Sequence, residues 1–237
     1  SKEYAPIAAK AGAIIIDNTS EFRYIDDIPL IVPEVNAIDI AQYEKTNIIA
    51  NPNCSTIQML VALKPIHDRY KILSINVCTY QEVKPSVYPK QIAFNVIPFV
   101  DSFCENGYTK EEMKMVWETQ KILDKNIKVN ATAVRVPVLI GHSESVTIET
   151  QSPVDIKEIM SDFENNDGIE LIDKPDSNEY PTAFLNGHGT DKVYVGRVRK
   201  SLDSDNILNI WVVADNVRKG AALNSVQIAE QLIKGER

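Results

Sequence analysis

Short apolar runs rich in β-branched residues recur along this 237-residue chain, and segments with the spacing of amphipathic helices lie among them. The apolar runs predict strands at 13–17, 30–33, 47–50, 72–80, 129–139, 145–150, 192–199 and 207–214. Helical spacing predicts helices at 2–11, 56–69, 109–123, 156–163 and 219–233. Because the two kinds of element are interleaved, the sequence predicts an α/β or α+β fold.

Two parts of the chain differ in the strands that they predict. The first fifty residues give helix, strand, short extended runs, strand and helix, an order that resembles the second half of a doubly wound sheet. Between residues 72 and 214 the strands are longer and alternate apolar with polar residues, which is typical of a largely antiparallel sheet with one face toward solvent. The few helices of this part can cover only some of that sheet, so we expect a homodimer built through it.

Charge and cysteine content narrow the class of protein. Asp and Glu outnumber Lys and Arg by 33 to 25, and the net charge of −8 disfavours a nucleic-acid partner. The chain has no apolar run of eighteen residues and no signal-peptide pattern at its N-terminus, so we expect no membrane partner. Three cysteines without paired spacing indicate reduced thiols and a cytoplasmic location.

Glycine is scarce, with nine residues in the whole chain and only Gly12 before residue 100. Neither G-x-G-x-x-G nor G-x-x-x-x-G-K-[ST] can be drawn through their positions. The chain therefore contains no glycine-rich loop of the kind that holds a phosphate group.

Cys54 lies where a predicted strand ends, the segment 51–53 turns the chain, and a predicted helix begins. The positive end of the helix dipole and the unpaired N–H groups at such a position favour a thiolate over a thiol. The other two cysteines lack this setting. Cys54 is therefore a candidate nucleophile, and a small buried structural residue is the alternative.

His142 follows Gly141, where the strand predicted at 129–139 stops. A histidine in a solvated loop at a strand end is suited to act as a general acid or base. A structural turn histidine is the alternative. The other two histidines are weaker candidates, because His67 falls near the end of a predicted helix and His188 lies between two glycines of a predicted exposed loop.

Arg135 precedes His142 by seven residues on the same predicted strand. An odd separation places the two side chains on opposite faces unless the strand bends near Pro137. The planar guanidinium suits bidentate binding of a small carboxylate, and a surface ion pair is the alternative.

Glu111, Lys114 and Glu118 are spaced by three and four residues on the helix predicted at 109–123. Such a row usually forms a solvated face with weak ion pairs. The apolar side of the same helix is expected to be core only: Met113, Val116, Trp117 and Ile122.

Residues 51–59 read NPNCSTIQM, and residues 135–146 read RVPVLIGHSESV. Both segments resemble the signature regions of aspartate-β-semialdehyde dehydrogenases. The resemblance extends over nearly the whole chain, through residues 16–23, 32–36, 79–81, 92–98, 195–199 and 214–222.

The resemblance implies an α/β fold that combines a partial doubly wound dinucleotide-binding domain with an α+β catalytic and dimerisation domain whose sheet is largely antiparallel. The implied boundaries are 1–55 for the remnant of the NADP-binding domain, 56–215 for the catalytic and dimerisation domain, and 216–237 for a C-terminal helix that returns to the NADP-binding domain. The implied activity is the reversible, NADPH-dependent conversion of β-aspartyl phosphate to aspartate semialdehyde and phosphate, in the biosynthesis of aspartate-derived amino acids. No metal is implied.

The resemblance also implies roles for individual residues. Cys54 would be the nucleophile that forms a thioester, His142 the acid–base, and Gln81 the residue that orients the acyl intermediate. The remaining implied roles are substrate α-carboxylate binding by Arg135, amino-group binding by Glu111, phosphate binding by Arg23, Asn53 and Lys114, and contact with the nicotinamide carboxamide by Asn216.

The chain departs from the family pattern at two places. The family begins with a strand and a G-x-x-G-x-x-G loop for NADP, and no such segment precedes Ser1. After Val83 the family continues through a Ser-Gly-Ala-Gly loop and a helix, whereas Lys84 follows here. We therefore expect a break in the chain between Val83 and Lys84, and whether these residues alone bind NADP stays open.

Two other readings remain open. An N-acetyl-γ-glutamyl-phosphate reductase uses the same chemistry on an N-acylated substrate, but Glu111 favours a free ammonium group. A catalytically silent, dimer-forming fragment or paralogue is the second alternative, although Cys54, Gln81, Arg135 and His142 occur together.

Overall fold

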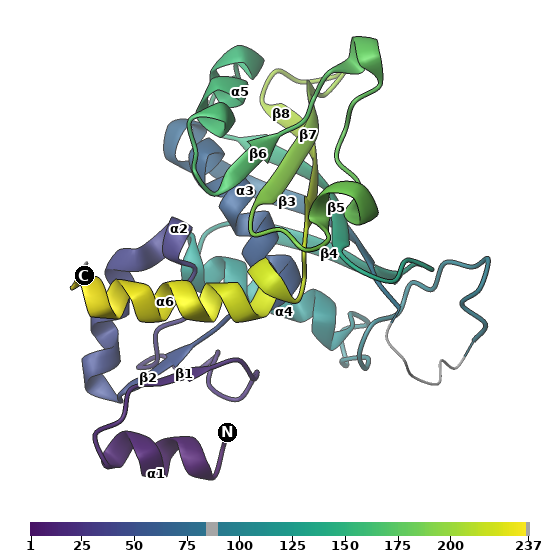
Figure 1. Cartoon of the computed structure of the whole chain (residues 1–237). Coiled ribbons are helices and arrows are strands. Elements are labelled where there is room, and N and C mark those ends of the chain that lie inside the picture. Colours follow the sequence, from purple (N-terminus) through teal and green to yellow (C-terminus); the bar gives the residue numbers. More distant parts are fainter. Residues whose placement is uncertain (84–89, 236–237) are drawn as a thin grey trace.

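The computed structural model describes residues 1–83 and 90–235, and its strands form two sheets (Figure 1). The smaller sheet pairs β1 (Ile15–Asp17) with β2 (Ile48–Ala50) in parallel. The larger sheet has six strands in the order β4-β3-β5-β8-β7-β6. Its strands are β3 (Ile72–Gln81), β4 (Lys128–Arg135), β5 (His142–Thr150), β6 (Ile169–Leu171), β7 (Val193–Lys200) and β8 (Ile207–Ala214).

The large sheet is mostly antiparallel in its centre and parallel at both edges. The pairs β3–β5, β5–β8 and β7–β8 are antiparallel, whereas β3–β4 and β6–β7 are parallel. The helices are α1 (Tyr4–Lys10), α2 (Pro33–Asn36), α3 (Cys54–Tyr70), α4 (Lys110–Ile122), α5 (Ile156–Glu164) and α6 (Leu223–Lys234). Shorter helical segments are η1 (Ala37–Lys45), η2 (Pro175–Ser177), η3 (Ala183–Gly187) and η4 (Arg218–Ala222). The predicted α/β class with a largely antiparallel sheet is confirmed.

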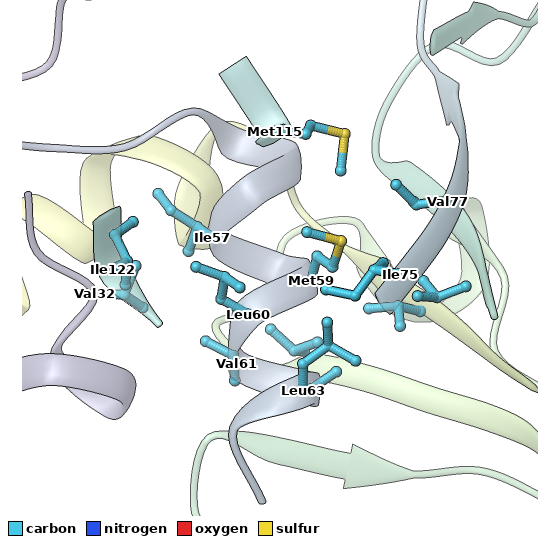
Figure 2. Close-up of a cluster of buried hydrophobic side chains, with 14 of the residues drawn as sticks. Val32, Ile57, Met59, Leu60, Val61, Leu63, Ile75, Val77, Met115 and Ile122 are labelled. Atoms are coloured by element: carbon cyan, nitrogen blue, oxygen red, sulfur yellow. The ribbon is translucent and has the colours of Figure 1, made fainter. Parts of the chain in front are cut away.

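Helix α3 is the centre of the main core. Figure 2 shows its apolar side chains packed toward Ile75 and Val77 of β3 and toward Met115 of α4. Most of its residues are buried, because α2, α4 and α5 contact it in addition to the sheet. A helix so enclosed fixes the position of its first residue, Cys54, relative to the strands.

Most predicted bounds shift by one to three residues in the structure, and three predicted elements differ more. The strand predicted at 30–33 is wrong, because Leu30 makes only an isolated bridge to Ala50 and Pro33 begins α2, where its missing N–H costs nothing. The strand predicted at 129–139 ends at Arg135. The helix predicted at 219–233 divides into the π-helical turn η4 and the regular helix α6.

Helix α6 packs back against the N-terminal part of the chain (Figure 1). Ile228 joins a separate core cluster with Ile31, Ile40 and Ile49. The connection is reinforced by Lys219, which is 1% exposed and donates from Nζ to both carboxylate oxygens of Glu34 at 2.7 and 2.8 Å. Burial lowers the pKa of Lys219, and the Glu34 charge opposes that effect.

The break predicted between Val83 and Lys84 lies outside the described residues. Among the helices that the structure describes, none has the length and apolar character needed to cross a bilayer.

Candidate active site

Cys54 is the first residue of α3, two positions earlier than the predicted helix start at residue 56. Asn53 is the N-cap, and its Oδ1 accepts hydrogen bonds from the N–H groups of Ser55 at 3.0 Å and Thr56 at 3.4 Å. This cap orients the first turn of a seventeen-residue helix and leaves the thiol at its positive end. The thiol is half-buried, so a reagent or substrate can reach it.

A glycine clears the space beside Cys54. A Cβ added to Gly220 of η4 would lie 2.6 Å from the Cβ of Cys54, which is closer than real Cβ contacts. The π-helical turn that replaces the first turn of the predicted C-terminal helix therefore brings a bare backbone against the candidate nucleophile. Sequence reasoning did not identify this role, and the only signal for it is the glycine within the segment 214–222.

His142 lies against Cys54, with its Nδ1 3.6 Å from the sulfur and 3.4 Å from Oγ of Ser55. It is the first residue of β5 and is 1% exposed. The prediction that His142 lies in a solvated loop at the end of a strand is therefore wrong. Arg135 ends a different strand, β4, and the expected bulge near Pro137 is unnecessary. The Cys54–His142 pair is therefore a contact between a half-buried thiol at a helix N-terminus and a buried imidazole at a strand N-terminus.

The second ring nitrogen of His142 contacts the Glu82 carboxylate. Burial lowers the pKa of His142, but the adjacent Cys54 sulfur and the Glu82 carboxylate raise it by more, to about 10. The imidazole is then protonated at neutral pH. A protonated imidazole against sulfur stabilises a thiolate and can donate a proton.

Gln81 and Arg135 lie side by side because they are paired at the carboxyl ends of the parallel strands β3 and β4. The Gln81 amide is 1% exposed and donates to Oγ of Ser55 at 3.1 Å and to Oε1 of Glu111 at 3.2 Å. The Arg135 guanidinium donates to the Glu82 carbonyl at 2.7 Å and lies 4.0 Å from the carboxylate of the same residue. The ends of these strands thus place an amide and a cation in the region of the Cys54–His142 pair.

The row on α4 is not a solvated face, because Glu111 is 6% exposed and Glu118 is fully buried. Glu111 accepts from Asn53 Nδ2 and from Lys114 Nζ, both at 3.0 Å. Burial alone would raise the pKa of Glu111, but the Lys114 charge and these hydrogen bonds lower it. The two side chains therefore remain an ion pair beside the helix cap.

Arg23 and Glu118 extend this network on the other side of Asn53. Glu118 accepts from the Asn53 N–H at 2.6 Å and from Arg23 at 3.0 Å. The expected core face of α4 is partly wrong, because Trp117 is 43% exposed and stacks edge-on against Tyr24 at 5.2 Å. Carboxylates occupy the buried face instead, since cations and N–H donors from other elements reach them there.

Asn216 completes the rim of the site, between Gly141 and Glu82. Its Oδ1 accepts from the Gly141 N–H at 3.1 Å, and its Nδ2 donates to Oε1 of Glu82 at 3.2 Å. An amide that both donates and accepts suits a nicotinamide carboxamide.

Glu82 is a site residue that the sequence reasoning missed. Its carboxylate contacts His142, Asn216 and the neighbourhood of Arg135. The available signal was its position directly after Gln81 at the end of a buried strand. Within residues 1–83 and 90–235 no group of three or more His, Cys, Asp or Glu side chains is arranged to hold a metal ion.

We predict that iodoacetamide at about pH 6.5 modifies Cys54 before Cys78 and Cys104. The imidazolium and the helix N-terminus stabilise the Cys54 thiolate, whereas burial raises the pKa of the Cys78 thiol. Peptide mapping after partial alkylation measures the order. Faster labelling of either other cysteine contradicts the assignment.

Two family models match this chain. The family model of the semialdehyde dehydrogenase dimerisation domain matches residues 63–219, and that of the semialdehyde dehydrogenase NAD-binding domain matches residues 1–43. Aspartate-semialdehyde dehydrogenase of Shewanella violacea is 56% identical over 259 residues, which cover 99% of this chain and 76% of the relative. Because that alignment is longer than the chain, the relative carries residues within it that have no counterpart here.

Two solved structures of aspartate-semialdehyde dehydrogenases superpose on this chain. Aspartate semialdehyde dehydrogenase II of Vibrio cholerae, complexed with ASA, superposes with a TM-score of 0.95 at 52% identity and covers 99% of this chain and 76% of that one. The Candida albicans enzyme with NADP superposes with a TM-score of 0.80 at 25% identity, covering 98% of this chain and 72% of that one.

Proposed function

This chain belongs to the aspartate-semialdehyde dehydrogenase family of oxidoreductases, and we propose that it converts β-aspartyl phosphate to aspartate semialdehyde with NADPH through a thioester on Cys54. The observation that carries the proposal is the half-buried thiol at the N-terminus of α3, 3.6 Å from a buried imidazole. A polarised thiolate and a proton donor at this distance are what acyl transfer through a cysteine requires.

In the first step the Cys54 sulfur attacks the acyl carbon, and the C–O bond to phosphate breaks. Lys114 and the side-chain amide of Asn53 would bind the leaving phosphate near the helix N-terminus, where anions are stabilised. Arg23, which is hydrogen-bonded to Glu118, would contribute further positive charge that stabilises the phosphate. Gln81 would orient the acyl group from the end of β3.

In the second step the thioester carbonyl is reduced, and a nicotinamide, when bound, would supply the hydride. His142 protonates the developing oxygen and later takes that proton back as the C–S bond breaks and the aldehyde leaves. Burial of the imidazole, at 1% exposure, keeps water from competing for this proton. Asn216 would hold the nicotinamide carboxamide at the rim.

The α-carboxylate and the ammonium group of the substrate each need a side chain of opposite charge, and Arg135 and Glu111 can supply these charges. We assign the α-carboxylate to Arg135, in exchange for its present contacts with Glu82, and the ammonium group to Glu111. Because the Glu111 carboxylate stays charged, it favours a free ammonium over an acetamide.

A phosphate-dependent assay tests the proposal. With aspartate semialdehyde, NADP and inorganic phosphate, absorbance at the NADPH band should rise, and omission of phosphate should stop it. The N-acetylated glutamate semialdehyde is the control substrate. Equal or faster turnover of that control would contradict the assignment.

We predict that Arg135→Lys raises KM for aspartate semialdehyde more than it lowers kcat. An ammonium cannot reproduce the two parallel hydrogen bonds of a guanidinium to a carboxylate, so ground-state binding weakens most. Steady-state kinetics separates the two constants. Arg69→Lys, at an exposed ion pair with Asp162, is the control and should leave both unchanged. An unaltered KM for Arg135→Lys would remove this residue from the carboxylate site.

We further propose that the protein is a homodimer formed through the outer face of the large sheet. Tyr80 and Trp211 stack there at 5.5 Å, and both stay partly exposed. Half-buried aromatic residues on an open sheet face favour association with a second copy. Sedimentation at micromolar concentration should give twice the chain mass, and a clean monomer would refute the dimer.

A further inference from the structure

A second polar layer lies directly beneath the Cys54–His142 pair. Residues two apart on a strand share a face, so Glu144 points the same way as His142 on β5. Thr79, the partner of Glu144 across the β3–β5 pairing, likewise shares a face with Gln81. On α3, Gln58 follows Cys54 by four residues and therefore lies one turn below it. Gln58, Thr79 and Glu144 thus repeat the arrangement of Cys54, Gln81 and His142 one step deeper.

The deeper layer is sealed from solvent and is short of hydrogen bonds. Gln58, Thr79 and Glu144 are all 0% exposed. Among the described residues, six buried side-chain polar atoms lack a hydrogen-bond partner, and four of them are the amide atoms of Gln58 and the carboxyl oxygens of Glu144. The two side chains lie close enough to interact. Such a concentration of unpaired groups in one place calls for a specific explanation, since buried polar atoms are normally paired.

Glu144 cannot be an ordinary carboxylate in this position. Burial raises its pKa well above the usual range, the nearby His142 and the Gln58 amide offset this only in part, and a negative charge on the Cys54 sulfur adds to the rise. A protonated carboxyl has one O–H donor and one C=O acceptor, which match the carbonyl and NH₂ groups of an amide. The acid form can therefore exchange two hydrogen bonds with Gln58, whereas the anion can only accept.

We propose that Glu144 is a positioning residue that, as an uncharged acid paired with Gln58, sets the spacing between the first turns of α3 and the start of β5. Cys54 and His142 are carried by these same two segments, so their 3.6 Å contact depends on that spacing. The inference rests on the proposed function only in taking Cys54 and His142 as the reacting pair.

An uncharged group at this place also protects the thiolate. A carboxylate beneath the pair would repel the sulfur anion while it attracted the imidazolium, and the two effects oppose each other in the reacting state. An acid or an amide fills the layer with the required donors and acceptors without adding charge. The side chain's shape and hydrogen-bonding capacity, and not its charge, are then what the site requires.

The test measures the rate of Cys54 alkylation by iodoacetamide against pH, because this reaction needs neither substrate nor cofactor. Glu144→Gln keeps the shape and is never charged, so its rate should stay within about twofold of the unsubstituted protein, with the same pH midpoint. Glu144→Leu removes the hydrogen bonds and should slow alkylation about tenfold near neutral pH. Gln58→Leu should match it, and the double variant should be no slower than either single one. Glu149→Gln, on an exposed position of the same strand, is the control and should change nothing.

Two results would overturn the proposal. A shift of the pH midpoint in Glu144→Gln would mean that Glu144 acts through its charge. An unchanged rate of Cys54 alkylation in Glu144→Leu or in Gln58→Leu would mean that the layer only fills space. If Glu144→Leu does not fold, the rate in Gln58→Leu provides the test. Neither result bears on whether the chain turns over aspartate semialdehyde, so the failure of this inference and that of the proposed function remain distinct.

Discussion

Cys54→Ser is expected to lower turnover of aspartate semialdehyde by at least about a thousandfold. A serine hydroxyl stays protonated near neutral pH, and neither the helix N-terminus nor His142 can supply enough stabilisation to make it a comparable nucleophile. The substitution is nearly isosteric at a half-buried position, so the thermal unfolding midpoint should change little.

The control for this variant is Cys104→Ser. Cys104 is also half-buried, but it lies in a turn that precedes α4, where its N–H donates to the Tyr108 carbonyl. Its kcat should equal that of the unsubstituted protein. Mass spectrometry after brief incubation with the acyl substrate adds a second measurement, since an acyl adduct should form in the control and not in Cys54→Ser. Substantial activity in Cys54→Ser would eliminate the thioester mechanism.

Gly220→Ala is expected to lower kcat about a hundredfold with a smaller loss of stability. The new methyl group would lie 2.6 Å from the Cβ of Cys54 and 3.2 Å from its Cα, so the collision is with atoms at the backbone of a capped helix. Relief requires η4 or the first turn of α3 to move, and either movement displaces the sulfur from His142. Crystallography or the alkylation rate of Cys54 reports the displacement directly.

Gly12→Ala is the matched control for this prediction. Gly12 has a positive φ of 94° and no atom within 4 Å of an added Cβ, so alanine strains the backbone there without a collision. It should cost about 1–2 kcal/mol of unfolding free energy and leave Cys54 alkylation unchanged. If Gly220→Ala alkylates at the normal rate, then the close approach of η4 has no role in positioning the nucleophile.

The sequence predicted the central helix and five of the six strands of the large sheet, because their signals are local, but it did not predict the short edge strand β6. Residues 207–214 form an almost continuous apolar run and give β8 with the predicted bounds. The pair Cys54 and His142 could also be anticipated, since each lies next to a strand or helix boundary. The prediction that Arg135 and His142 share one strand was wrong, because Arg135 ends β4 and His142 begins β5. The residues between them, 136–141, have no periodic pattern of apolar and polar residues that would distinguish a loop from a strand.

What the sequence could not predict depends on contacts between distant segments. Glu111 and Glu118 have the spacing of a solvated row, and their burial becomes favourable only because Arg23 and Asn53 reach them from other elements, in addition to Lys114 on the same helix. Glu144 has the alternation of an ordinary strand residue, and nothing in its neighbours along the chain indicates a buried carboxyl whose oxygens lack a hydrogen-bond partner. A periodic pattern identifies which side of an element a residue occupies, but not what faces that side.

The packing of α6 onto the first fifty residues has a consequence for synthesis on the ribosome. The ribosome releases three isoleucines of this cluster early: Ile31, Ile40 and Ile49. The cluster is completed only by Ile228, and the Ile31 carbonyl accepts its hydrogen bond from the side-chain amide of Asn224. The N-terminal segment must therefore remain unfinished, with apolar surface exposed to chaperones and proteases, while nearly all of the remaining chain is translated. In nascent chains stalled at increasing lengths, protection of these early residues from proteolysis should appear only after the C-terminal helix has emerged.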